Sequence, residues 1–178
     1  ALHAGQEPDP ATGSRAPPIY QTSAYVFDDD EHAAELFALE SDPMAYAGAY
    51  TGKNIYSRIM NPTTMMLENR LATLEGGVGC MATASGMSSL DLATFLLAEN
   101  GDNIVTASAL YGGTYTYFTH TASRRGIETR FVDTLDYEAY AEAIDEDTAY
   151  VHAETIGNPA LVTPDLERLA EIAHENGA

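Results

Sequence analysis

Two segments of this sequence carry groups that could bind a phosphate. Ser85 and Gly86 stand where a helix is expected to begin, and Tyr56 and Arg58 precede an earlier helix. Free backbone N–H groups and the helix dipole attract anions at such a start, and glycine lets a phosphate approach closely. Arginine can bind phosphate through two parallel hydrogen bonds. Simpler alternatives are a plain serine N-cap and a surface arginine beside a half-buried tyrosine.

Two further segments follow predicted strands and could bind a planar ring. Tyr111 begins the first, Tyr-Gly-Gly-Thr, and the second runs from Glu154 through Asn158 to Pro159. Ligands of open α/β sheets bind at the carboxyl ends of strands. There the Tyr111 ring could stack on a flat molecule, Asn158 could bind a ring hydroxyl, and Glu154 could hold the loop. The alternatives are a packed tyrosine and an Asn-Pro turn with a solvated glutamate. Together the four segments favour a site for a flat, phosphorylated cofactor.

The elements that must position these segments alternate along the chain. From residue 61 onward, short apolar runs alternate with amphipathic stretches. This alternation predicts an α/β fold, a mostly parallel sheet covered by helices on both faces. The predicted helices cover residues 30–39, 62–75, 85–99, 115–125, 136–144 and 164–176, and the predicted strands cover 102–107, 127–132 and 148–154.

Two of these helices have explicit boundaries and apolar faces. Asn61 and Pro62 suit the N-cap and the first helical position, and Gly76 with Gly77 ends that helix. Its apolar face is predicted to be Leu67, Leu71 and Leu74. The last helix is predicted to open at Pro164 and stop at Gly177, with an apolar face of Leu166, Leu169, Ala170 and Ala173.

The two ends of the chain differ from this regular part. Prolines predict an irregular arm over residues 1–61, and the Gly- and Tyr-rich residues 41–54 are predicted to be a loop. The chain stops directly after the last predicted helix, where a doubly wound domain would add another strand. We therefore expect the sequence to be part of a longer protein.

The composition excludes several classes of function. The chain has 27 acidic and 8 basic residues and a net charge of −19, which disfavours binding to nucleic acid or anionic membranes. Because the acidic residues are spread along the chain, a halophilic source is favoured over mimicry of an acidic partner. One cysteine and scattered histidines predict no disulfide and no metal site. No secretory signal or apolar span is visible, which favours the cytoplasm.

The motifs occur in an order that resembles the Cys/Met-metabolism family of pyridoxal-phosphate (PLP) enzymes. The resemblance covers nearly the whole chain and includes HAGQEPDPATGSRAPPIYQTSAY (3–25), NIYSRIMNPTT (54–64), LEGG (74–77), ASGMSS (84–89), LYGGTY (110–115) and AETIGNP (153–159). The opening block and the Thr-Ile-Gly form of the last motif look most like the O-acetylhomoserine sulfhydrylases of this family.

The resemblance implies two sources of phosphate contacts. Tyr56 and Arg58 match the pair that reaches across a dimer interface to the neighbour's PLP phosphate. Ser85, Gly86 and Met87 match the phosphate loop of the subunit's own cofactor. The family is also implied to form homo-oligomers, expected here as a homotetramer.

The resemblance also implies ring contacts and two missing groups. Tyr111 matches the tyrosine that stacks on the pyridine ring close to the reacting atoms. Asn158 matches the residue facing the ring hydroxyl, and Glu154, its loop neighbour, is counted with the cofactor-binding residues. The family's aspartate for the pyridinium nitrogen and its Schiff-base lysine are not in this sequence. Lys53, the only lysine, lies in the predicted loop, outside the context of that lysine.

The implied fold is the aspartate-aminotransferase-like fold type I, here truncated. Residues 1–60 are expected to form an arm that contacts the neighbouring subunit, and residues 61–178 to begin the PLP-binding large domain. The implied reaction converts O-acetylhomoserine and sulfide into homocysteine and acetate, with the 178-residue segment alone inactive. The alternatives are a cystathionine gamma-synthase, a cystathionine or methionine gamma-lyase, a non-catalytic phosphate-binding α/β module, or a degenerate structural relative.

Overall fold

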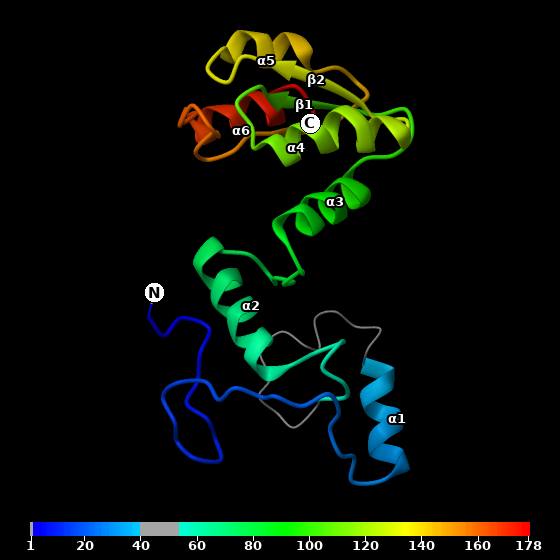
Figure 1. The fold of residues 1–178 in the computed structure, drawn as a ribbon, viewed down its shortest axis with the longest axis vertical. Coiled ribbons are helices and arrows are strands. Elements are labelled where there is room, and N and C mark those ends of the chain that lie inside the picture. Colours follow the sequence, from blue (N-terminus) through cyan, green and yellow to red (C-terminus); the bar gives the residue numbers. More distant parts are fainter. Residues whose placement is uncertain (1, 40–53) are drawn as a thin grey trace. The chain divides into compact units, whose positions relative to one another are not determined.

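The computed structural model describes residues 2–39 and 54–178 (Figure 1). The chain divides into two compact units, Ala1–Ala82 and Thr83–Ala178. This division falls later than the functional boundary expected after residue 60, because the first long helix belongs to the same unit as the arm. Except for Asn54, the predicted loop 41–54 lies outside the described residues, as does Lys53.

The N-terminal unit contains two helices, α1 (Asp30–Leu39) and α2 (Pro62–Glu75), both as predicted. The Asn61 side chain caps α2 by accepting a hydrogen bond of 2.9 Å from the Thr63 backbone N–H. Gly76 ends α2 with a φ of 67°, a left-handed conformation that glycine adopts without strain. Local sequence rules therefore fix both ends of this helix.

The leucines of α2 share one side of the helix, as their spacing predicts, but this side is exposed. Leu67, Leu71 and Leu74 are 52 %, 39 % and 51 % exposed. The buried side chains of α2 are instead Pro62, Met65 and Met66, and Met65 packs in a cluster with Leu36, Ile55 and Met60. Leucine spacing alone could not identify the buried face, because that face is covered in part by Leu36, which is distant in sequence.

The C-terminal unit is built on a parallel sheet of three strands in the order β2-β1-β3. The strands are β1 (Asn103–Ala107), β2 (Glu128–Val132) and β3 (Thr148–His152). Every residue of the central strand β1 is buried. The predicted α/β class with a parallel sheet is confirmed.

Helices α3 (Gly86–Leu97), α5 (Tyr137–Ala143) and α6 (Leu166–Glu175) agree in type with the prediction. The helix predicted over 115–125 begins earlier, as α4 (Gly112–Thr116), and continues as the π-helix η2 (Tyr117–Ala122). Helix α6 begins at Leu166 and not at Pro164, because the Asp165 side chain accepts from the Arg168 N–H and forms the N-cap. Its buried residues are Leu169 and Ala173; Leu166 and Ala170 are exposed.

Helices α3 and η2 lie against one face of the sheet. The Tyr150 hydroxyl on β3 is 2.7 Å from Thr94 Oγ1 of α3, and the His152 ring makes an edge contact with Phe118 of η2. Burial raises the pKa of Tyr150 to about 12. Ile104, Phe118 and the other buried apolar side chains of this unit form one core around the sheet.

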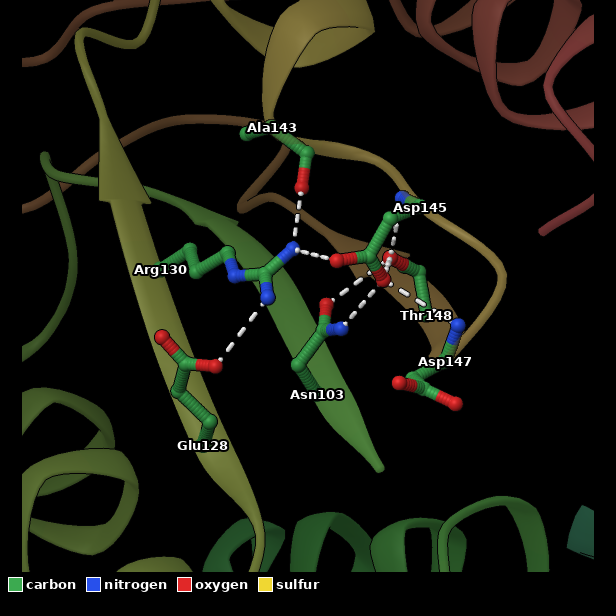
Figure 2. Close-up of polar contacts among 7 residues, drawn as sticks. All are labelled: Asn103, Glu128, Arg130, Ala143, Asp145, Asp147 and Thr148. Carbon is green, nitrogen blue, oxygen red and sulfur yellow. Dashed lines mark hydrogen bonds and ion pairs between the residues drawn. The ribbon is translucent and has the colours of Figure 1, made fainter. Parts of the chain in front are cut away.

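A polar network ties the amino ends of all three strands together (Figure 2). Asp145 lies at its centre and accepts from Arg130 at 2.6 Å and from the buried Asn103 at 2.7 Å. Arg130 also donates to Glu128, and Thr148 Oγ1 donates to Asn103 Oδ1 at 2.8 Å. Because the buried polar groups have hydrogen-bond partners, the network stabilises this end of the sheet.

This network predicts a loss of stability in acid. Hydrogen bonds from Arg130 and then Asn103 lower the pKa of Asp145 from 3.8 to about 2. A lowered folded-state pKa gives a stability that is present above the ordinary pKa and is lost as pH falls through the folded one. We expect the free energy of unfolding to fall between about pH 4 and pH 2, and Asp145→Asn to lack part of that fall.

Urea unfolding across this pH range measures the effect. The matched control is Glu146→Gln, which changes the exposed carboxylate next to the network. Equal acid slopes for wild type and Asp145→Asn would contradict the prediction.

Candidate functional site

The start of α3 presents backbone donors at an open surface. Ser85 is the N-cap, and its Oγ accepts from the Ser88 N–H at 3.1 Å. The N–H groups of Gly86 and Met87, in the first turn, have no acceptor within the helix. A Cβ placed on Gly86 would meet no atom within 4 Å, so the backbone there is open to a ligand. This geometry fits an anion such as a phosphate.

Hydroxyl groups reinforce this start. Thr83 Oγ1 lies 2.7 Å from Ser89 Oγ, and Ser85 Oγ lies 3.0 Å from Ser88 Oγ. Ser89 belongs to the segment predicted to open this helix, ASGMSS (84–89), whereas Thr83 was not predicted to take part in the turn. The signal was available in the Thr-x-Ser pattern just before the helix, because such hydroxyls bond locally at helix starts.

The two segments predicted at the carboxyl edge of the sheet meet in the structure. Tyr111 follows β1, Glu154 follows β3, and Glu154 Oε1 accepts a hydrogen bond of 2.8 Å from the Tyr111 backbone N–H. The Tyr111 side chain is 53 % exposed. Its ring therefore has a free surface on which a planar group could stack.

The Asn158 loop is tightly turned. The Gly157 N–H donates to the Val162 carbonyl, and the Leu161 N–H donates to the Gly157 carbonyl, both at 2.7 Å. The Asn158–Pro159 peptide is cis. Asn158 itself is exposed, and its amide has no hydrogen bond to the described parts of the chain. A ligand at this edge would therefore find the amide free.

A partly buried histidine lies just below this edge. His152 ends β3, and its Nδ1 is 3.1 Å from Thr106 Oγ1. Burial lowers the pKa of His152, and the nearby Glu154 carboxylate opposes that shift. The ring is therefore neutral at neutral pH and serves as a packed polar residue.

Tyr56 and Arg58 belong to the N-terminal unit, whereas the site residues described so far belong to the C-terminal unit. The Tyr56 backbone forms an isolated antiparallel bridge with Ala24. The Arg58 guanidinium lies 5.7 Å from the centre of the Tyr56 ring. Over the ranges 2–39 and 54–178, Arg58 has no carboxylate partner, whereas Arg125 and Arg130 are ion-paired. Arg58 thus keeps its charge available for an external anion.

The structure therefore brings Tyr111 and Glu154 together, beside the loop that carries Asn158. It places Ser85, Gly86 and Met87 in the same unit, at the start of a helix that contacts α4.

In the described part of the chain, no cluster of three or more His, Cys, Asp or Glu residues could hold a metal ion. The same residues contain no helix long and apolar enough to cross a membrane.

A parallel α/β sheet with an open helix start and an exposed aromatic at its carboxyl edge is typical of the class of proteins that bind phosphorylated cofactors. The model of the family described as Cys/Met metabolism PLP-dependent enzyme matches residues 1–178. The chain belongs to this family.

Curated relatives match almost the entire chain. The chain is 51 % identical over 176 residues to a homocysteine synthase of Schizosaccharomyces pombe. The matched region covers 99 % of this chain and 39 % of the relative. The chain is also 49 % identical over 177 residues to an O-acetyl-L-homoserine sulfhydrylase of Leptospira meyeri. This match covers 99 % of this chain and 38 % of that relative. The chain thus spans less than half the length of these relatives.

Solved structures agree with the fold. An O-acetylhomoserine (thiol)-lyase of Campylobacter jejuni that carries N′-pyridoxyl-lysine-5′-monophosphate has a TM-score of 0.81 and 36 % identity, and covers 98 % of this chain and 40 % of that chain. The structure of metB from Corynebacterium glutamicum has a TM-score of 0.82 and 31 % identity. The match covers 99 % of this chain and 42 % of that chain. The expectation of a truncated fold type I enzyme is confirmed.

Proposed function

We propose that this chain is part of a PLP-dependent transferase that makes homocysteine and acetate from O-acetylhomoserine and sulfide. The observation that carries the proposal is the pairing of Glu154 with Tyr111 beside Asn158, at the edge of a sheet whose relatives include sulfhydrylases. In this reaction the bond between Cγ and the acetate oxygen breaks, and a bond between Cγ and sulfur forms.

The residues of this chain would bind and orient PLP. The first N–H groups of α3 and the Ser85 hydroxyl fit its phosphate, the Tyr111 ring fits its pyridine face, and Asn158 fits its ring hydroxyl. PLP, when bound, supplies the electron-withdrawing group that the chemistry requires. Tyr111 would lie closest to the reacting atoms.

We further propose that Tyr56 and Arg58 bind the phosphate of a neighbouring subunit, with residues 1–60 as the contacting arm. This arrangement makes the protein a homo-oligomer, proposed as a homotetramer. Support comes from the exposed Arg58 guanidinium, which has no carboxylate partner in the described ranges although acidic residues outnumber basic ones 27 to 8. Sedimentation of the complete protein tests the oligomeric state.

The decisive experiment is the denatured intact mass of the complete protein before and after borohydride reduction. One PLP retained covalently after reduction supports the proposal, and a protein that retains none supports the phosphate-binding module instead. Assays with O-acetylhomoserine then compare sulfide with cysteine as the acceptor. Preference for cysteine would favour a cystathionine gamma-synthase, and methionine or cystathionine cleavage would favour a gamma-lyase.

The 178-residue chain by itself is proposed to be inactive, because none of its motifs contains the lysine that holds PLP covalently in the family. Sulfhydrylase turnover by the purified 178-residue chain would overturn this point.

The acidic composition supports a high-salt source as a further proposal, and the cytoplasm remains the compartment that we propose from the sequence. Screening of a net charge of −19 should raise the midpoint of thermal unfolding as the salt concentration increases. A midpoint that does not rise with potassium chloride would argue against salt adaptation.

A further inference from the structure

The segment of residues 108–111, here called the Tyr111 segment, is held from the β2 side of the sheet. Thr134 follows β2, is 4 % exposed, and accepts a hydrogen bond of 3.0 Å at its Oγ1 from the Ala109 N–H. The Ser108 N–H donates to the Val132 carbonyl at 2.8 Å. The backbone before Tyr111 therefore has two fixed attachments to the end of β2.

The same segment is held from the β3 side. Glu154 accepts from the Tyr111 N–H at 2.8 Å. A Cβ on Gly157 would lie 2.7 Å from the Ala109 carbonyl oxygen and 3.0 Å from Ala109 Cβ, so only glycine permits this approach. The Tyr111 segment is thus confined between two neighbouring loops.

The Tyr111 ring itself rests on a glycine. A Cβ on Gly113 would overlap Cε1 of the Tyr111 ring and lie 3.1 Å from its Cδ1. Gly113 is in helix α4 and does not have a positive φ, so its backbone would accept alanine. The space taken by the ring, and not backbone strain, is what requires glycine here.

We propose that Thr134, Glu154 and Gly113 are positioning residues that set the Tyr111 ring in its stacking orientation before the cofactor binds. The hydrogen bonds from the two neighbouring loops fix the Tyr111 backbone. Gly113 has no side chain, and this leaves the space that the Tyr111 ring occupies. A ring that is ordered in advance loses little rotamer freedom on binding, which strengthens binding. This inference deepens the proposed function and rests on it.

The first test compares Gly113→Ala with Gly112→Ala in the complete protein. The two glycines are adjacent in α4, and a Cβ on Gly112 would meet no atom within 4 Å. Alanine raises helix propensity at both positions, so similar thermal stability of the two variants would show that weaker binding by Gly113→Ala comes from the displaced ring and not from unfolding of α4. We expect Gly113→Ala alone to weaken PLP binding, by about tenfold, because it displaces the ring. Equal PLP dissociation constants for the two variants would overturn this part of the inference.

The second test follows the backbone of the cofactor-free protein by hydrogen–deuterium exchange. Thr134→Val removes the acceptor for the Ala109 N–H, whereas Thr134→Ser keeps it. We expect exchange in residues 108–111 to be about tenfold faster in Thr134→Val and in Glu154→Ala, and near wild type in Thr134→Ser and Glu154→Gln. Unchanged exchange in both Thr134→Val and Glu154→Ala would overturn the inference.

The two experiments separate this inference from the proposed function. If wild-type protein binds no PLP, the proposed function fails, while the exchange data still decide whether Thr134 and Glu154 hold the Tyr111 segment. If PLP binds normally but exchange in the variants does not change, only the inference fails.

Discussion

Replacing Arg58 by alanine in the complete protein is expected to weaken PLP binding about a hundredfold, because the two charge-assisted hydrogen bonds that we propose to the phosphate would be lost. Arg58 is exposed. Within the described ranges, the only interaction of its guanidinium is with the Tyr56 ring. Arg58→Lys should recover part of the affinity, since lysine keeps the charge but not the paired geometry. The PLP dissociation constant, measured by absorbance titration, checks this result.

Arg124→Ala is the matched control. Arg124 is also exposed and has no ion pair within the described ranges, so its loss removes the same charge without touching the proposed site. Equal weakening by both variants would point to a general charge effect and contradict the prediction.

Sharing of the site between subunits can be tested with the same variant. If the proposed shared site exists, mixed oligomers of Arg58→Ala and Tyr111→Ala subunits should regain activity, since the proposed site would combine Tyr111 from one subunit with Arg58 from the other. Mixtures as inactive as the separate variants would exclude a shared site.

Replacing Gly5 by alanine is expected to destabilise the N-terminal unit by about 4 kcal/mol. Gly5 has a φ of 65°, and a Cβ there would lie 2.5 Å from the Asn69 carbonyl oxygen and 2.9 Å from the Arg70 nitrogen. Both atoms belong to the backbone of α2, which cannot move aside without breaking the helix. Next to this contact, Arg70 hydrogen-bonds Gln6. The variant should therefore release the start of the arm from α2.

Gly13→Ala separates the two causes of this loss. Gly13 has a φ of 71°, but a Cβ there would meet no atom within 4 Å. This variant should cost only about 1 kcal/mol, the penalty for a left-handed alanine. Urea unfolding measures both changes, and similar values for the two variants would show that the contact with α2 contributes nothing.

Local rules predicted much of the fold. The caps at Asn61 and Ser85, the order of strands and helices, and the meeting of Tyr111 with Glu154 follow from short-range signals and from the geometry of parallel sheets. The structure confirms Ser85 as an N-cap, and this cap is compatible with an anion site because other N–H groups of the first turn stay open, so the anion site stays a prediction.

Contacts between residues distant in sequence were not predictable in this way. Nothing local indicates that Met65 and Met66 are buried while the leucines of α2 are exposed, since the arm decides that face. The same holds for Gly5 against Asn69, and for Thr134, whose role depends on a neighbouring strand. The π-helical turn of η2 also has no clear sequence signal.

The strand order has a consequence for how this sheet can grow. With β1 in the centre, only β2 and β3 have outer edges in the described sheet. On β2, the ion-paired charges of Glu128 and Arg130 make that edge a poor template for pairing. The β3 edge has no such charged pair. Any further strand, whether from the same polypeptide or from a misfolded copy, would therefore add beside β3, so that edge is where aggregation of an isolated segment should begin.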